Sequence, residues 1–210
     1  MSDPSPEAAG APREARPRAT FIMGLAGALV ALLMVGGGAW FWLSGEDGPM
    51  TIGGPFVLVD GDGRTVTERS FRGKYMLVYF GFTWCPDVCP TTLGQVADAL
   101  DRLGPEAERV VPVLISLDPK RDTPKAMKEY AAALHPRLVG LTGTPEQTAA
   151  AARAYRVYWA EKRTGPGEGD YTLDHSSILY LMGPDGRFIS PINASASGEQ
   201  MAAELRRLMK

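Results

Sequence analysis

Nearly continuous apolar runs mark two buried strands in this 210-residue chain. They cover residues 75–82 (YMLVYFGF) and 110–117 (VVPVLISL). Such runs are typical of strands that are covered on both faces of a sheet. Residues 138–141 add a short third strand. We predict that the run at 75–82 is the central strand.

After Pro90 the apolar positions repeat with a helical period. One helical face carries Leu93, Val96, Ala97, Leu100 and Leu103, and a Gly-Pro pair at 104–105 ends the helix. Thr123, followed by a proline, predicts the start of a second helix. Residues 144–147 (TPEQ) form a capping box for a third helix, and Ser197 caps the last one.

Two β-hairpins flank these elements. The first pairs residues 56–60 with 64–67 around an Asp-Gly-Asp-Gly turn, and the second pairs residues 177–182 with 187–190 around Pro-Asp-Gly. The DGDG string lacks the later acidic positions of a calcium loop, so a plain turn is favoured. Residues 155–160 are a candidate for one further strand.

The order of these elements predicts the fold class. Strands that alternate with helices and close with a hairpin indicate an α/β (α+β) domain of thioredoxin-like fold, a mixed sheet flanked by helices with an N-terminal and a C-terminal hairpin. We place this domain at residues 55–210. A glycine-rich loop at 165–169 precedes its C-terminal hairpin.

The N-terminal part of the chain has a different composition. Residues 1–18 are rich in Pro, Ala, Ser and Glu and predict a disordered tail, and residues 44–54 predict a linker. Residues 19–43 carry no charge, and a helix of about 25 residues exceeds the roughly 30 Å thickness of a membrane core. We therefore predict one transmembrane helix. A cleaved signal peptide is the alternative, although the run is longer than the apolar h-region of a typical signal peptide.

The charges around this segment predict its orientation. Arginines precede it, whereas Glu46 and Asp47 follow it, which favours a cytoplasmic N-terminus and an exported C-terminal domain. A long transit peptide rich in Arg and Ser is absent, so we expect a bacterial inner membrane with the domain in the periplasm. The alternative is the mitochondrial inner membrane with the domain in the intermembrane space. Either compartment allows a cysteine pair to cycle between thiol and disulfide.

Charge and cysteine content narrow the classes of function. The 22 basic and 24 acidic residues nearly cancel, and no basic run lies beyond the N-terminal arginines, so we exclude nucleic acid as a partner. Two cysteines are too few for a disulfide-rich scaffold. We therefore expect the cysteines to have a chemical role.

Cys85 and Cys89 lie between the end of the central strand and the start of a helix. The helix N-terminus favours thiolate over thiol, which makes such a pair reactive or a good metal ligand. Thioredoxin-like oxidoreductases have two residues between their cysteines, whereas this pair has three. The wider loop can hold two sulfurs around a metal ion. Two inert buried thiols are the simpler alternative.

The chain has two histidines that could complete a metal site. His175 precedes the C-terminal hairpin, and in a thioredoxin-type sheet that loop lies beside the cysteine turn. Asp174 could orient its imidazole, although a solvated carboxylate fits equally well. His135 lies at a helix C-terminus, where we interpret it as a cap. Two thiolates and one imidazole suit copper(I), while zinc stays possible.

Four stretches resemble the Sco/SenC family of copper-binding assembly factors for cytochrome c oxidase. In chain order they are GGPFVLVDGDGR, FRGKYMLVYFGFTWCPDVCP, SLDPKRDTP and YTLDHSSILYLMGPDGRF. The resemblance spans about residues 53–205 and implies a thioredoxin-like domain on one N-terminal transmembrane helix. It also implies that copper is bound by Cys85, Cys89 and His175.

The resemblance also bears on three further positions. It implies contact with a partner or support of a loop for Asp87 in CPDVCP and Asp118 in SLDPKRDTP. A turn that caps the following helix accounts for most of residues 118–124. Trp84 stands where the family commonly has His or Tyr.

We therefore expect a membrane-anchored copper chaperone and not an enzyme. It would receive copper from an upstream donor and deliver it to the binuclear copper centre of cytochrome c oxidase subunit II. The alternative is a thiol–disulfide oxidoreductase that keeps the partner's cysteines reduced, which would not need His175. A peroxiredoxin-like peroxidase would share the fold, but the sequence shows no clear peroxide site.

Overall fold

The structure is a computed structural model that describes residues 51–210. The predicted tail (1–18), the predicted transmembrane helix (19–43) and most of the predicted linker (44–54) lie outside the described residues. From residue 51 onwards, no helix is both long and apolar enough to cross a membrane.

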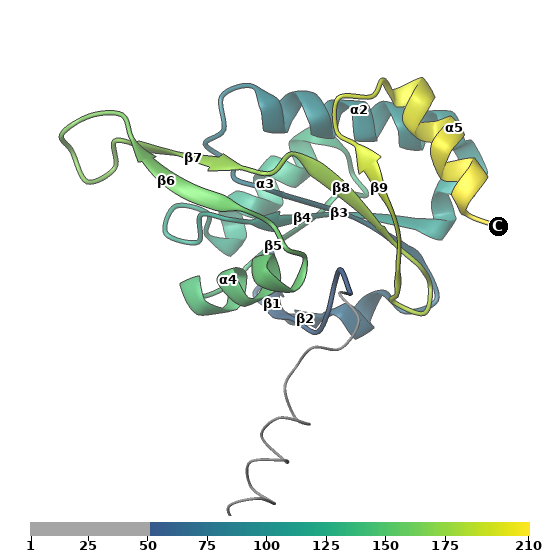
Figure 1. The fold of residues 1–210 in the computed structure, drawn as a ribbon, viewed down its shortest axis with the longest axis horizontal. Helices are drawn as coiled ribbons and strands as arrows, with labels where there is room; N and C mark the ends of the chain where they lie inside the picture. The colour runs from purple at the N-terminus through teal and green to yellow at the C-terminus, as the bar shows by residue number, and fades with distance from the viewer. Residues whose placement is uncertain (1–50) are drawn as a thin grey trace, which may run out of the picture. The chain divides into compact units, whose positions relative to one another are not determined.

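The main sheet contains seven strands (Figure 1). They are β1 (Val57–Asp60), β2 (Thr65–Thr67), β3 (Tyr75–Gly81), β4 (Val110–Ser116), β5 (Val139–Thr142), β8 (Ile178–Met182) and β9 (Phe188–Asn193). Their order in the sheet is β2-β1-β5-β4-β3-β8-β9. β3 runs parallel to β4 and antiparallel to β8, and all of its residues are buried, as its apolar run predicts. The two predicted hairpins are present as β1–β2 and β8–β9.

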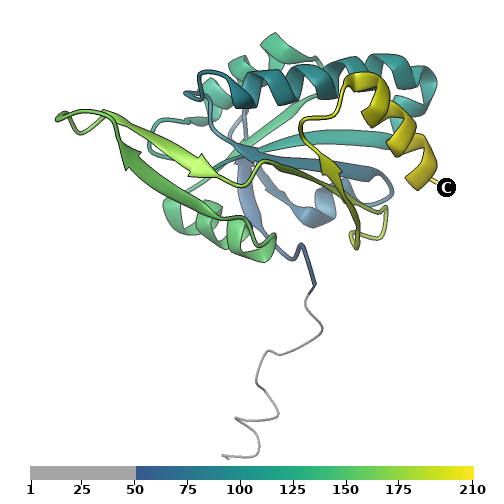
Figure 2. The same ribbon diagram turned by 45° about the horizontal axis from the view of Figure 1, so that its top comes forward.

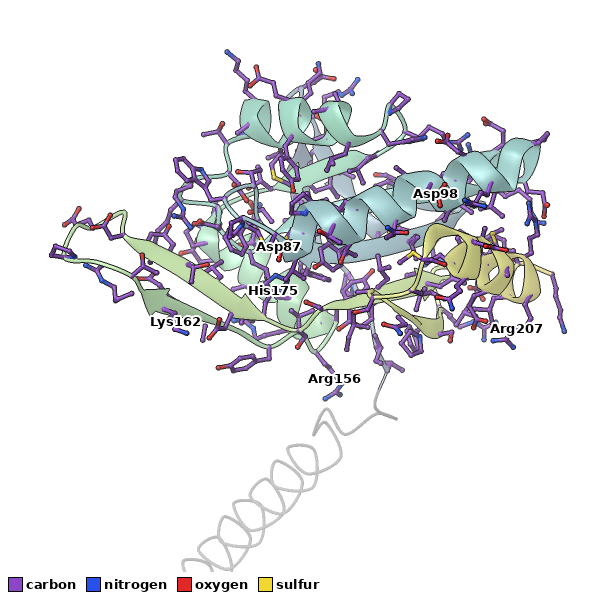
Figure 3. All side chains as sticks on the ribbon, turned by 90° about the horizontal axis from the view of Figure 1, so that it is seen from above. Asp87, Asp98, Arg156, Lys162, His175 and Arg207 are labelled. Carbon is purple, nitrogen blue, oxygen red and sulfur yellow. The ribbon has the colours of Figure 1, made fainter. Side chains whose placement is uncertain are left out.

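Helices cover both faces of this sheet (Figures 1 and 3). One face carries α2 (Val88–Leu103), α3 (Pro124–Leu134) and α5 (Gly198–Leu208), and the other carries α4 (Pro145–Ala154). Two 3-10 turns, η1 (Glu68–Phe71) and η2 (Gly104–Arg109), complete the helical elements of residues 51–210. The predicted caps are confirmed, because Thr123, Thr144 and Ser197 each accept a hydrogen bond from a first-turn backbone N–H. The mixed α/β architecture matches the prediction.

The strand predicted at residues 155–160 is wrong in its position. Tyr155 ends α4, and Arg156 adopts a left-handed conformation with φ 55°. The N–H of Arg156 donates to the carbonyl oxygen of Arg153, and the N–H of Val157 donates to the carbonyl oxygen of Ala152. This is the Schellman pattern of a helix end. The apolar residues at this point pack into the core as part of that helix end, and the strand begins only at Trp159.

A second, two-stranded sheet consists of β6 (Trp159–Arg163) and β7 (Tyr171–His175). It projects from the body of the domain as a long hairpin, seen in green in Figures 1 and 2. The predicted glycine-rich loop at 165–169 forms its tip. Neither strand pairs with the main sheet, and the sequence did not predict this hairpin. It matters for function because His175 is the last residue of β7.

Candidate metal site

The two cysteines lie where β3 passes into α2. Cys85 belongs to the turn after the strand, and Cys89 lies in the first turn of α2, which begins two residues before the predicted start. The N–H of Cys89 donates to the Cys85 sulfur at 3.3 Å. Cys85 is half-buried, Cys89 is fully buried, and both thiols are free. Cys85 is therefore partly accessible to solvent, while Cys89 lies in the core.

The structure brings His175 to this turn from the other end of the chain. Its Nε2 lies 3.7 Å from the Cys89 sulfur, and its Nδ1 lies 3.0 Å from the carbonyl oxygen of Ser176. A carbonyl oxygen can only accept, so Nδ1 carries the proton and Nε2 turns its lone pair toward the sulfur. Burial lowers the pKa of His175, which favours the neutral imidazole that binds metals.

The chemistry of Cys89 follows from its burial. Burial, followed by the hydrogen bond with the Cys85 side chain, raises the pKa of the Cys89 thiol to about 12. The backbone of Phe82 acts in the opposite direction. Without a metal this residue is therefore a thiol at neutral pH. A metal ion that binds here replaces the thiol proton, as metal–thiolate bonding requires.

The three predicted ligands form a partial cluster. Cys89 contacts both of the others, since its sulfur faces the His175 imidazole and its N–H faces the Cys85 sulfur. In the part of the chain that the structure describes, no three Cys, His, Asp or Glu side chains are already close enough to enclose a metal ion. The donor set of two thiols and one neutral imidazole nevertheless fits a soft ion such as copper(I).

The strand behind the cysteines leaves room for the Cys89 sulfur. A Cβ atom added at Gly81 would lie 3.0 Å from Cys89 Sγ, closer than an ordinary contact. The ring of Phe82 packs edge-on against the His175 imidazole, with centroids 6.0 Å apart. We did not predict a role for Gly81, although it lies in the FGF stretch next to the cysteines.

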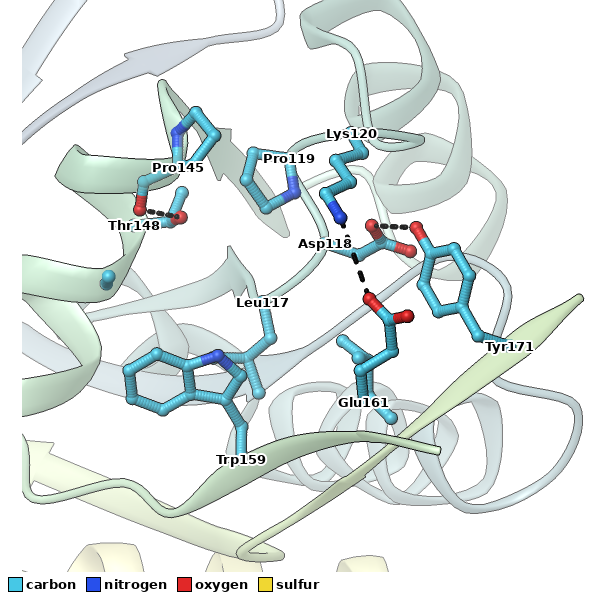
Figure 4. A pocket seen from close by; sticks show the side chains of 11 residues that line it. Leu117, Asp118, Pro119, Lys120, Pro145, Thr148, Trp159, Glu161 and Tyr171 are labelled. Carbon is cyan, nitrogen blue, oxygen red and sulfur yellow. Dashed lines mark hydrogen bonds and ion pairs between the residues drawn. The ribbon is translucent and has the colours of Figure 1, made fainter. Parts of the chain in front are cut away.

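The buried carboxylate of Asp118 supports the hairpin that carries His175. It accepts a hydrogen bond of 2.8 Å from the Tyr171 hydroxyl (Figure 4). It also pairs with Arg121. Arg121 in turn donates to the Tyr171 carbonyl oxygen at 3.1 Å and lies over the Tyr171 ring at 3.8 Å. Of the two roles that the resemblance implies for Asp118, the contacts fit loop support.

Asp122 supports the cysteine side, and sequence reasoning missed it. Its fully buried carboxylate accepts hydrogen bonds from the Thr83 N–H, from the Thr83 hydroxyl at 2.6 Å and from the Ser116 hydroxyl at 2.7 Å. Burial raises the pKa of Asp122. Thr83 leads directly into the cysteine turn. The loop between β4 and α3 thus holds both halves of the candidate site.

The remaining predicted residues lie around the site or away from it. Asp87 is the exposed N-cap of α2 (Figure 3). Its only side-chain hydrogen bond within residues 51–210 is from the Thr91 hydroxyl at 3.3 Å. Asp174 is exposed, and the Ser176 carbonyl makes the contact with the imidazole that we considered for Asp174. His135 is the C-cap of α3, as predicted.

Trp84 is exposed beside the cysteines. Its side chain is 66% exposed, and its ring lies 5.5 Å from the guanidinium carbon of Arg121. The distance is within the range of a cation–π contact. Trp84, where the sequence departs from the family pattern, therefore lies at the surface. It is next to Arg121, which supports the hairpin that carries His175.

Comparisons with known proteins agree with this architecture. The profile of the SCO1/SenC family matches residues 44–210. The chain is 47% identical over 143 residues to the mitochondrial protein SCO1 homolog 1 of Arabidopsis thaliana. That match covers 68% of this chain and 42% of the relative, so the chain spans less than half of the relative's length.

Two solved structures extend the comparison. ScoI of Bradyrhizobium japonicum with copper bound is 46% identical, with a TM-score of 0.69, and the match covers 75% of this chain and 99% of that one. BsSco, described as a member of the Sco family of cytochrome c oxidase assembly proteins with a disulfide switch, is 26% identical, with a TM-score of 0.59, and the match covers 75% and 93%. Both structures support the mixed α/β, thioredoxin-like fold. This chain belongs to the SCO1/SenC family.

Proposed function

We propose that this protein is a copper chaperone that binds copper through Cys85, Cys89 and His175. One observation carries the proposal: the free lone pair of His175 Nε2 faces the buried Cys89 sulfur at 3.7 Å, across from the turn that holds Cys85. Copper(I) suits two thiolates and one imidazole. The copper bound to the related ScoI supports the choice of metal.

The destination of the copper is part of the proposal. We infer delivery to the binuclear copper centre of cytochrome c oxidase subunit II, after loading from an upstream copper donor. The description of BsSco as an oxidase assembly protein supports this direction. Transfer would proceed by ligand exchange, which begins at the half-buried Cys85 because a partner thiolate can reach the metal from that side. The protein would not turn over a substrate as an enzyme does.

We also propose that residues 19–43 anchor the domain in a membrane. The uncharged run and the arginines before it support a single-pass protein with a cytoplasmic N-terminus and a periplasmic domain. The mitochondrial inner membrane, facing the intermembrane space, is the alternative, and the mitochondrial Arabidopsis relative favours it. Protease protection of the domain in sealed membranes tests the orientation.

Copper titration of the full chain tests the copper site. The wild-type protein, purified reduced, is expected to bind one copper(I) per chain, and Cys85→Ser or His175→Ala to weaken binding sharply while the domain stays folded. His135→Ala is the matched control, because that histidine caps α3 and contacts Arg137 and Asp101 instead of the cysteine turn. Equimolar binding by His175→Ala as tight as that of the wild type would contradict the three-ligand site.

A thiol–disulfide oxidoreductase is the second candidate function. It is favoured by the asymmetry of the pair, since the half-buried Cys85 accepts an N–H while burial keeps Cys89 protonated. An attacking thiol and a buried resolving thiol would show this arrangement. The two functions differ in their need for His175. If His175→Ala restores oxidase assembly in a deletion strain as well as wild type does, the redox role is favoured.

A further inference from the structure

Tyr79 is a core tyrosine whose hydroxyl has no hydrogen-bond partner among residues 51–210. The side chain lies in the middle of β3 and is fully buried. A buried polar group without a partner is unfavourable, so such a group in a folded protein needs an explanation. The position of Tyr79 relative to the candidate metal site supplies one.

Tyr79 lies directly behind two of the proposed copper ligands. Its ring packs edge-on against the His175 imidazole, with centroids 6.1 Å apart and planes at 71°. The same ring and the Cys89 sulfur border the bare backbone at Gly81, where an added Cβ atom would lie 3.2 Å from Tyr79 Cε1 and 3.0 Å from Cys89 Sγ. Tyr79 therefore contacts the site from the side of the core.

The side chains of Cys89, Thr92 and Ser177 lie near the Tyr79 hydroxyl, although none of them has the geometry of a hydrogen bond with it. The Thr92 hydroxyl already donates to the Ala194 carbonyl oxygen at 3.3 Å, and Ser177 is exposed to water. Cys89 differs from both, because a metal would convert its buried thiol to a thiolate. A hydrogen bond to an anion is stronger than one between neutral groups. The thiolate is thus the acceptor that gains most from this hydroxyl.

We propose that Tyr79 is a positioning residue whose hydroxyl donates a hydrogen bond to the Cys89 thiolate when the site holds copper. The inference rests on the proposed copper-binding function. The thiol proton of Cys89 leaves as the metal binds, and the phenol proton stays on Tyr79. The bond holds the sulfur in place and withdraws electron density from it. Hydrogen bonds around the sulfur tune the reduction potential of copper–thiolate sites.

Tyr79→Phe in the full chain tests this inference, because it removes only the hydroxyl. Copper(I) affinity is measured by competition with a chromophoric chelator and is expected to fall about tenfold. We expect the copper(II)–thiolate absorption band to move to longer wavelength and the reduction potential of the copper to fall. Tyr155→Phe is the matched control, since this buried tyrosine packs against Phe80 on the opposite face of β3.

Thermal unfolding of the metal-free variants separates positioning from a structural role. Tyr79→Phe is expected to unfold at the wild-type temperature or above, because the lost hydroxyl has no partner there. Marked destabilisation without copper would overturn the inference, as would wild-type affinity, band position and potential in Tyr79→Phe. In those cases wild-type protein that binds copper still supports the proposed function. If wild type binds no copper, the proposed function itself is wrong.

Discussion

The two segments that carry the proposed ligands are anchored in different ways. Cys85 and Cys89 lie between β3 and α2, which both pack in the core. His175 ends β7, whose only strand partner among residues 51–210 is β6, a strand without a fully buried residue. Side-chain contacts of Asp118 and Arg121 attach this hairpin to the body of the domain.

We call Cys85 and Cys89 the sulfur half of the site and His175 the imidazole half. The core and the buried carboxylate of Asp122 hold the sulfur half, so a change there is expected to act on the stability of the whole domain.

The imidazole half is held by the packing of Tyr171 and Leu173 and by polar contacts of Asp118 and Arg121. Removing one of these polar contacts is expected to act mainly on metal affinity. The four substitutions below test this distinction and run from the largest expected effect on stability to the smallest.

Asp122→Ala is expected to have the largest effect. It removes the acceptor of three hydrogen bonds, from the Thr83 N–H, the Thr83 hydroxyl and the Ser116 hydroxyl. Buried donors without a partner are costly, and we expect the free energy of unfolding to fall by about 3 kcal/mol. Urea denaturation of the metal-free full chain measures it. Glu129→Ala is the control, because that carboxylate is largely exposed. A loss no larger than that of the control would contradict the role of Asp122.

Gly81→Ala also acts on the sulfur half. The added methyl group meets Cys89 Sγ at 3.0 Å and Tyr79 Cε1 at 3.2 Å in a packed core. Overpacking of this kind costs about 2 kcal/mol in the free energy of unfolding. Since the sulfur is displaced, copper affinity is expected to fall about tenfold, measured by chelator competition.

Gly94→Ala is the matched control for that substitution. Gly94 lies on the exposed face of α2, and nothing lies within 4 Å of its added Cβ atom. Alanine in a helix interior is expected to raise the free energy of unfolding by about 1 kcal/mol and to leave copper affinity unchanged. Equal copper affinities in the two variants would show that the space at Gly81 does not serve the site.

Asp118→Asn acts on the imidazole half. The amide still accepts from the Tyr171 hydroxyl but no longer neutralises Arg121, whose side chain is only 17% exposed. We expect a loss of about 1.5 kcal/mol in the free energy of unfolding, together with a fall in copper affinity that is smaller than that of His175→Ala. Asp170→Asn, at the hairpin tip, is the control. The distinction between the halves is wrong if Asp118→Asn destabilises the domain without affecting copper affinity.

The sequence predicts the sulfur half well because its signals are local. A strand buried on both faces reads as an apolar run, as at residues 75–82, and Thr-Pro pairs mark helix starts. The two cysteines stand at the junction of such elements, so their position follows from the pattern alone. The three residues between Cys85 and Cys89 then distinguish this pair from that of thioredoxin-like oxidoreductases and allow a metal ion to bind between the sulfurs.

The imidazole half depends on contacts that the sequence does not show. β6 (WAEKR) is exposed along much of its length and pairs with a single strand, so it carries no clear apolar period. Arg156 adopts a positive φ although it is not glycine, so the sequence lacks the glycine that usually marks the end of a helix such as α4. In the sequence, Asp122 has the pattern of an ordinary acidic residue before a helix. Only the fold shows that it is buried. The predictions were therefore least accurate next to the hairpin that carries His175.

Lys120→Ala is expected to have the smallest effect. Lys120 pairs with Glu161 of β6 at 3.6 Å, across a cavity of about 170 Å³ beneath the hairpin (Figure 4), and both side chains are more than 40% exposed. Exposed ion pairs contribute about 0.5 kcal/mol or less, so unfolding and copper affinity should stay close to wild type, even in high salt. If Lys120→Ala weakens copper binding as much as Asp118→Asn does, the exposed contacts of Lys120 with Glu161 and with the Tyr171 ring hold the hairpin. The buried contacts of Asp118 would then not be what places His175.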